Sequence, residues 1–233
     1  MLELIAESNW ERPIYVAYTV GQENYMNLGD NFVQEGLANR ITPFTTNIDG
    51  RPVSGMTDFD TEKTYDNVMN RFKFGGINAK GIYLDETVMR MCFTHRRLLV
   101  KLATQLVLEG KNDKAAAVLE RCEKEIPTYN VPHDFQCNSV EMARVYHVLG
   151  KKEKAMEVVD DLWKKSSQYL NYYTSLDTRS FKNSEQSCRV HLYVLNALVE
   201  LLESIDPELQ QKYLAEEHAL IQRYMSKGGT LGY

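Results

Sequence analysis

The chain has 233 residues, which is enough for one large domain or two small ones. Its hydrophobic content of 43% and charged content of 25% are ordinary for a folded protein in water. The net charge of −5, with no run of basic residues, argues against a nucleic-acid partner, because such a surface is normally basic.

The sequence contains no stretch that predicts a membrane span. One of the longest apolar stretches, Tyr193–Leu202, is interrupted by Asn196 and Glu200 and falls short of the roughly 18–20 apolar residues that cross a bilayer. Glu3 and Glu7 stand where a signal peptide would carry positive charge. If the chain is complete, we therefore expect it to be cytoplasmic.

Residues 1–84 are predicted to form a small mixed α/β part. Glycines break this region into short elements. They are Gly21, Gly29, Gly36, Gly50, Gly55, Gly75, Gly76 and Gly81. The patterns predict one or two helical turns over 1–8, a strand over 14–20 and a weaker strand over 37–45. A polar loop with a turn at Asp49-Gly50 is expected over 47–60. A helix is expected over 64–74 and should end at Gly75-Gly76.

Residues 85–233 are predicted to be helical throughout. Their apolar spacing and end signals indicate about three helical hairpins. The first hairpin starts at Asp85, turns at Gly110 and stops at Pro127. The second turns at Gly150, and its second helix runs on to Tyr173. The third has one helix over 190–205 and a second that starts at Asp206-Pro207, and a frayed tail follows from Gly228.

A near-repeat links the first two hairpins. Gly110-Lys-Asn-Asp-Lys-Ala115 returns forty residues later as Gly150-Lys-Lys-Glu-Lys-Ala155. The tetratricopeptide pattern places large and small residues around such a turn. Its positions are filled by Leu102, Ala103, Leu106, Gly110, Ala115, Leu119 and Pro127, and in the second copy by Met142, Ala143, Tyr146, Gly150, Ala155 and Val159 without the proline. The chain therefore resembles a tetratricopeptide-like stack over 85–233, and the expected fold class is mainly α.

A second resemblance covers nearly the whole chain. It is carried by the segments 9–15 (NWERPIY), 34–40 (QEGLANR), 65–73 (YDNVMNRFK) and 83–85 (YLD). In this order they look like the C-terminal soluble region of a family of bacterial multi-spanning membrane proteins that are similar to protein O-mannosyltransferases. The resemblance implies that the chain is a fragment and that it lies on the extracytoplasmic, periplasmic face of the inner membrane. Any sugar-transfer chemistry would belong to the membrane-embedded part, so no catalytic residue is carried over.

Several groups of reactive residues are weighed as sites and set aside. Cys92 with His95, and His133 with Cys137, lack the tight paired spacing of zinc sites. Asp58, Asp60 and Glu62 lack the Gly and distal Glu of a calcium loop. Ser184, His191 and Asp177 have no nucleophile-elbow context. We therefore expect no metal, no cofactor and no enzymatic activity in this chain, and we expect Cys92, Cys122, Cys137 and Cys188 to be buried thiols.

The aromatic residues Trp163, Tyr169, Tyr172 and Tyr173 are the candidate binding residues. Aromatic side chains on a concave helical surface can hold a peptide, and their faces can stack on sugars. The alternative is that these rings pack the second hairpin against the third, which is the commoner use of helical aromatics.

The expected function is a non-catalytic accessory and protein-interaction domain of a membrane glycosyltransferase-like protein, positioning a partner or acceptor polypeptide. The alternative is a free-standing cytoplasmic tetratricopeptide adaptor that binds a peptide in its groove. In both cases the partner is a protein or peptide, and a membrane is involved only through a missing N-terminal portion. The sequence predicts no oligomeric state.

Overall fold

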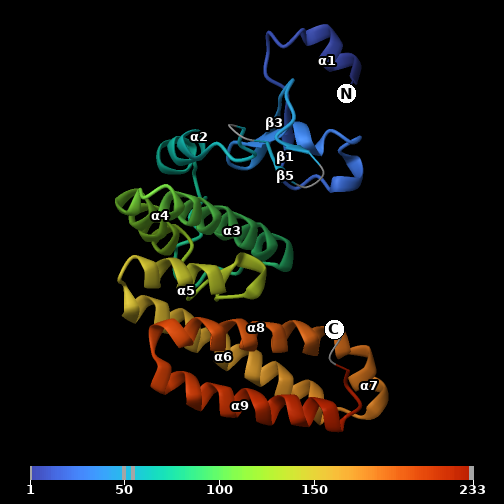
Figure 1. The fold of residues 1–233 in the computed structure, drawn as a ribbon, viewed down its shortest axis with the longest axis vertical. Coiled ribbons are helices and arrows are strands. Elements are labelled where there is room, and N and C mark those ends of the chain that lie inside the picture. The colour runs from blue at the N-terminus through green and yellow to red at the C-terminus, as the bar shows by residue number, and fades with distance from the viewer. Residues whose placement is uncertain (1, 49–50, 54–55, 231–233) are drawn as a thin grey trace. The chain divides into compact units, whose positions relative to one another are not determined.

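The computed structural model describes residues 2–48, 51–53 and 56–230 (Figure 1). The chain is 65% helical, with nine α-helices in the described residues and a small three-stranded antiparallel sheet near the N-terminus. The predicted class, mainly α with a small N-terminal α/β part, is confirmed. The chain divides into two compact units, residues 1–130 and residues 131–233. The expected domain boundary near residue 84 stays a prediction.

The first unit contains the sheet and four α-helices of the described residues. The strands are β1 (Tyr15–Ala17), β2 (Phe32–Gln34), β3 (Ala38–Ile41), β4 (Asn47–Ile48) and β5 (Arg51–Pro52). The α-helices are α1 (Leu2–Ser8), α2 (Thr61–Asp66), α3 (Glu86–Leu108) and α4 (Asn112–Glu125), and a π-helical turn, η3 (Asn67–Arg71), directly follows α2.

The three-stranded sheet has the order β1-β3-β2, and both of its pairings are antiparallel. Val16, Phe32 and Ile41, one from each strand, form its buried apolar cluster. The predicted strands correspond to β1 and β3, although both are shorter than expected. β2 was not predicted, because all three of its residues are buried and show no alternation. The predicted polar loop contains the short β4–β5 pair, and the Asp49-Gly50 turn lies outside the described residues.

A buried carboxylate joins two strands of this sheet to helix α2. The Glu35 side chain is only 1% exposed and pairs with Arg40 Nε at 2.6 Å and with Lys63 Nζ at 2.5 Å. The Tyr15 hydroxyl donates a third hydrogen bond to it at 2.7 Å. Burial by itself raises the pKa of Glu35, but the hydrogen bonds from Lys63, Tyr15 and Arg40 outweigh it, so the pKa is lowered and the carboxylate stays ionised.

A second polar contact joins the sheet to α3. Lys101 Nζ donates to Gln34 Oε1 at 2.7 Å and lies 4.6 Å from the centre of the Phe59 ring. Burial lowers the pKa of Lys101, and the charge of Asp58 opposes this. Nearby, the Thr61 hydroxyl donates to Glu109 Oε1 at 2.7 Å. Gln34 of β2 and Thr61 of α2 are therefore both held to α3 and its C-terminal end by hydrogen bonds.

The helix expected over 64–74 begins and ends earlier than its apolar spacing predicts. It starts at Thr61 because the Asp60 side chain caps it, accepting a hydrogen bond from Lys63 N. It ends in the π-helical turn η3, after which Phe72 is extended. The helix is therefore over before Gly75-Gly76, and these glycines do not form its end as predicted.

The near-repeat forms two matching turns. In each, the glycine has a left-handed backbone, with φ of 73° at Gly110 and 72° at Gly150. The lysine after each glycine donates its N–H to a carbonyl five residues back, Lys111 to Leu106 at 2.8 Å and Lys151 to Tyr146 at 2.9 Å. Both turns are thus Schellman motifs, which end a helix on glycine. The alanine that follows is fully buried in both hairpins, at Ala115 and Ala155.

The second unit contains five α-helices among its described residues: α5 (Ser139–Val148), α6 (Lys152–Ser175), α7 (Thr178–Asn183), α8 (Glu185–Ile205) and α9 (Pro207–Ser226). Helix α6 contacts each of the other four, and α8 also packs against α5 and α9 (Figure 1). The long second helix of the second hairpin and the start at Asp206-Pro207 are confirmed; Asp206 accepts from Leu209 N as a cap.

Two details of this unit differ from the expectation. The short helix α7 was not predicted; its start is capped by Asp177, which accepts from the N–H groups of Arg179 and Ser180. The tail was expected to fray from Gly228, but Thr230 is held by Tyr224, whose hydroxyl donates to its carbonyl at 3.1 Å. The last three residues lie outside the described part of the chain.

The left-handed backbone at Gly110 and Gly150 predicts that both positions require glycine. No other group lies within 4 Å of a Cβ added at Gly110 or Gly150. A substitution there is therefore strained only because its backbone must keep a positive φ. We expect Gly110→Ala and Gly150→Ala each to lower the free energy of unfolding by about 1–2 kcal/mol in urea titrations. Gly29, which has no positive φ, is the matched control, and an equal loss in Gly29→Ala would contradict the assignment.

An aromatic groove along helix α8

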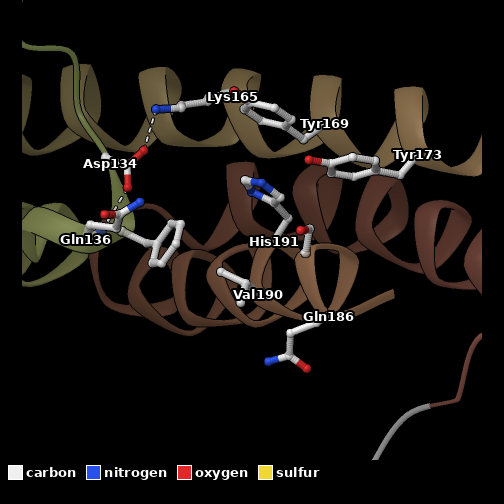
Figure 2. Close-up of a pocket in the computed structure, with 10 residues that line it drawn as sticks. Asp134, Gln136, Lys165, Tyr169, Tyr173, Gln186, Val190 and His191 are labelled. Atoms are coloured by element: carbon white, nitrogen blue, oxygen red, sulfur yellow. Dashed lines mark hydrogen bonds and ion pairs between the residues drawn. The ribbon is translucent and has the colours of Figure 1, made fainter. Parts of the chain in front are cut away.

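A hollow of about 290 Å³ opens between α6 and α8, and we call it the α6–α8 hollow (Figure 2). Helix α6 contributes Lys165, Tyr169 and Tyr173 at intervals of four residues, which places them on one face of the helix. The rest of the lining comes from the segment before α5 and from α8: Asp134, Phe135, Gln136, Gln186, Ser187, Val190 and His191.

Aromatic rings form the floor of this hollow. Tyr169 stacks on His191 with 4.7 Å between ring centres and 9° between ring planes. Tyr173 stacks on Tyr169 at 5.9 Å and 22°. Phe135 meets His191 edge to face at 6.2 Å. Figure 2 shows the Tyr169 and His191 rings facing each other across the two helices, so α6 and α8 together build the surface.

His191 is a neutral member of the floor. Its side chain is buried, and its Nδ1 lies 3.3 Å from the Ser166 hydroxyl. Burial lowers the pKa of His191, the carboxylate of Asp134 opposes that effect and the ammonium of Lys165 adds to it. The imidazole is therefore uncharged at neutral pH and offers an aromatic face rather than a cation.

The charged residues of the α6–α8 hollow neutralise each other. Lys165 Nζ contacts Asp134 Oδ2 at 2.5 Å, and the Asp134 side chain is 8% exposed. The other carboxylate oxygen of Asp134 accepts from Gln136 N at 2.9 Å. Among the described residues, the side chains of Tyr169, Tyr173, Gln136 and Gln186 make no hydrogen bond. The hollow therefore presents neutral hydrogen-bonding groups beside aromatic rings.

A second hollow, of about 340 Å³, lies between α5 and α8, and we call it the α5–α8 hollow. Its lining is Phe135, Asn138, Val140, Glu141, Arg144, Val190, Tyr193, Val194 and Ala197. Its two charged residues also pair, with Arg144 Nε 3.2 Å from Glu141 Oε2. Phe135 and Val190 line both hollows, so the two are neighbours along α8, and we call them together the α8 groove.

The four candidate binding residues have different positions. Tyr169 and Tyr173 line the α8 groove. Tyr172 is 59% exposed and touches Tyr173 at 5.5 Å, outside the lining. Trp163 is 6% exposed; its ring meets Tyr213 of α9 edge to face at 4.3 Å, and its Nε1 donates to Glu216 at 3.1 Å. Trp163 therefore packs α6 against α9.

Most residues of the groove do not stand out in the sequence. Lys165 stands four residues before Tyr169, so the helical spacing alone would have found it. Phe135, Gln136, Gln186 and His191 come from other elements and carry no motif. Only the packing of α6, α8 and the segment before α5 brings them together.

The other groups considered in the sequence have structural roles. Asp60 caps α2, and Glu62 pairs with Lys111 and Lys114. The members of the Ser–His–Asp set have separate contacts: the Ser184 hydroxyl donates to Ser180 O, and Asp177 caps α7. In the described part of the chain, no three His, Cys, Asp or Glu side chains gather as metal ligands.

The cysteines are buried as expected. All four are buried thiols. Burial raises the pKa of Cys92 and of Cys188, so both stay protonated. Cys137 Sγ lies 3.2 Å from the Ser139 hydroxyl, which also contacts His133 Nδ1 at 3.2 Å. This small cluster fixes the segment that leads into α5.

Comparison with known proteins gives a match for the N-terminal part of the chain. The family model described as TMEM260-associated domain 2 matches residues 1–63. This part of the chain contains α1 and the sheet, and it precedes the groove in sequence. No curated protein and no solved structure matches the chain. None of the helices in the described residues has the length and apolar character to cross a bilayer.

The position of Trp163 generates a stability prediction. We expect Trp163→Ala to lower the free energy of unfolding by about 3–5 kcal/mol, because it empties a buried site between α6 and α9. Urea unfolding followed by circular dichroism measures this loss. Tyr172→Ala is the control and should change stability by less than about 0.5 kcal/mol, because Tyr172 is largely exposed. Equal losses in the two variants would contradict the structural role of Trp163.

The burial of His191 generates a pH prediction. Its pKa is lowered in the folded state, so below the ordinary value of 6.5 the unfolded chain binds more protons than the folded one. Stability from this residue is therefore complete above pH 6.5 and is lost as the pH falls towards the folded pKa. We expect an NMR titration of His191 with a midpoint below 6.5, and a midpoint at or above 6.5 would contradict burial. In His191→Gln this part of the acid destabilisation should disappear.

Proposed function

We propose that this chain is a non-catalytic accessory domain of a membrane glycosyltransferase-like protein, where it holds a partner or acceptor polypeptide for the membrane-embedded part. The match of residues 1–63 to a TMEM260-associated domain supports the link to such a parent. In this proposal the domain lies on the periplasmic face of the inner membrane and its hairpins are tetratricopeptide-like.

The observation that carries the binding role is that the two hollows lie next to each other along α8. They share Phe135 and Val190, and their α8 residues follow one another from Gln186 to Ala197, so the α8 groove is elongated along the helix. An extended chain needs such a surface, with pockets for its side chains and polar groups for its backbone. Tyr193 is 74% exposed in the α5–α8 hollow and Tyr169 is 41% exposed in the α6–α8 hollow. Each hollow therefore presents one accessible tyrosine ring.

The nature of the groove favours binding over catalysis. Its carboxylates, Asp134 and Glu141, are paired with Lys165 and Arg144. Its histidine is buried, stacked and neutral. General acid–base chemistry requires a group within reach of the substrate proton and with a suitable pKa. The groove instead provides aromatic area and neutral hydrogen-bonding groups, which are the features of recognition surfaces.

The parent is tested by the full reading frame around Met1. We expect it to encode several membrane spans before this segment. A frame that begins at Met1 and has no upstream spans would contradict the accessory role and favour the free-standing cytoplasmic adaptor.

The binding role is tested with an unfolded polypeptide, namely fluorescently labelled, reduced and carboxymethylated α-lactalbumin. We expect the chain to bind it in fluorescence anisotropy titrations, and we expect Tyr169→Ala and Tyr193→Ala each to weaken binding about tenfold, since each removes an aromatic anchor. Tyr83 is 90% exposed in the other unit and makes Tyr83→Ala the control. Equal affinity in all three variants would contradict binding in the α8 groove.

A further inference from the structure

We infer that the α8 groove is selective for a proline-rich segment in the polyproline II conformation, and that its main subsite is the α6–α8 hollow. This inference rests on the proposed polypeptide-binding function and names the class of polypeptide. Three properties of the groove carry it: its charge balance, the kind of hydrogen-bonding groups that it leaves unused, and the spacing of its rings.

The charge balance argues against a ligand chosen by charge. Lys165 is paired with Asp134 in one hollow, and Arg144 with Glu141 in the other. A phosphate, a carboxylate or a cation would meet a side chain whose charge its partner already balances, and the Asp134 carboxylate is almost fully buried. His191 adds no charge at neutral pH. The ligand is therefore neutral where it contacts the floor.

The unused groups indicate what backbone the ligand has. The two long walls of the α6–α8 hollow, α6 and α8, are helices whose backbone N–H and C=O groups already bond within the helix, so neither wall can add a β-strand. A helical ligand would also bring satisfied backbone groups and leave the hydroxyls of Tyr169 and Tyr173 unpaired. A polyproline II chain has no internal hydrogen bonds, so all its backbone carbonyls are free to accept hydrogen bonds from the groove. The two hydroxyls and the amides of Gln136 and Gln186 can each donate one.

Proline suits this set of donors. Because proline has no N–H, a proline-rich chain presents many hydrogen-bond acceptors and few donors. The hydroxyls and amides of the groove can supply the donors. The pyrrolidine ring packs on aromatic faces such as those of Tyr169 and Tyr173. The chain is also stiff before it binds, so less conformational entropy is lost on binding.

The spacing of the rings fits two residues on neighbouring edges of this helix, which has three residues per turn. The stacked rings of Tyr169 and Tyr173 have centres 5.9 Å apart. Two residues of a polyproline II helix rise about 6.2 Å. From Lys165 to Tyr173 the row on α6 covers about 12 Å, or about four polyproline II residues. Beyond this row the groove continues past Val190 towards Tyr193, so the ligand extends further along α8.

The inference is tested with labelled decaproline, a Gly-Ser peptide of ten residues and methyl glucoside, each titrated into the full chain. We expect decaproline to bind at least about tenfold tighter than the Gly-Ser peptide. Tyr169→Ala should weaken decaproline binding about tenfold or more. Tyr169→Phe keeps the ring and its stack on His191 but removes the donor, and it should weaken binding about threefold. Tyr83→Ala should bind as the unaltered chain does, and thermal melts confirm that each variant is folded.

The outcomes separate this inference from the function beneath it. If unfolded α-lactalbumin binds through the groove but decaproline binds no tighter than the Gly-Ser peptide, the proline selectivity is wrong and the polypeptide-binding role stands. If methyl glucoside binds and Tyr169→Ala abolishes that binding while decaproline does not bind, the hollow is a saccharide site and the inference is overturned. If no polypeptide binds, both proposals are overturned.

Discussion

The second unit depends on the unbroken length of helix α6. Its 24 residues span about 36 Å, and α5, α7, α8 and α9 all pack against it. Between Lys152 and Ser175 there is no proline or glycine to stop the helix. Its buried side chains serve the packing, while Lys165, Tyr169 and Tyr173 stand on the face that meets the groove. A helix that ended after Trp163 would lose the buried residues Ser166, Leu170 and Thr174 as well as the three residues that line the groove.

The charged side chains of the groove balance one another, so the groove as a whole carries no net charge. Each charged side chain in the two hollows has its partner in the same hollow, and the buried imidazole is kept neutral by the same burial that lets it stack on Tyr169. The chain as a whole carries a net charge of −5, so this local balance differs from the average surface. A surface of this kind selects its ligand by shape, ring contacts and donor positions, and its affinity should depend little on salt.

Sequence reasoning succeeded where one residue has a fixed local effect and failed where distant elements combine. Gly110 and Gly150 end their helices, and Asp206-Pro207 starts one, because capping acts within a few residues. β2 was missed because its burial comes from both faces of the sheet, and α7 because a single cap at Asp177 was overlooked. Tyr169 and Tyr173 were found as helical aromatics, but His191 and Phe135 join them only through tertiary packing, which leaves no spacing in the sequence.

The contact of Lys101 with the sheet has a practical consequence for dissecting the protein. Gln34 and Phe59 lie within the segment that the family model covers. The Lys101 ammonium, which donates a hydrogen bond to Gln34 and lies over the Phe59 ring, comes from α3. A fragment cut at residue 63 or at residue 84 would lose that ammonium and the Glu109 partner of Thr61. The smallest piece of the N-terminal region that can be expected to stay folded in isolation therefore reaches through both α3 and α4, to about residue 130.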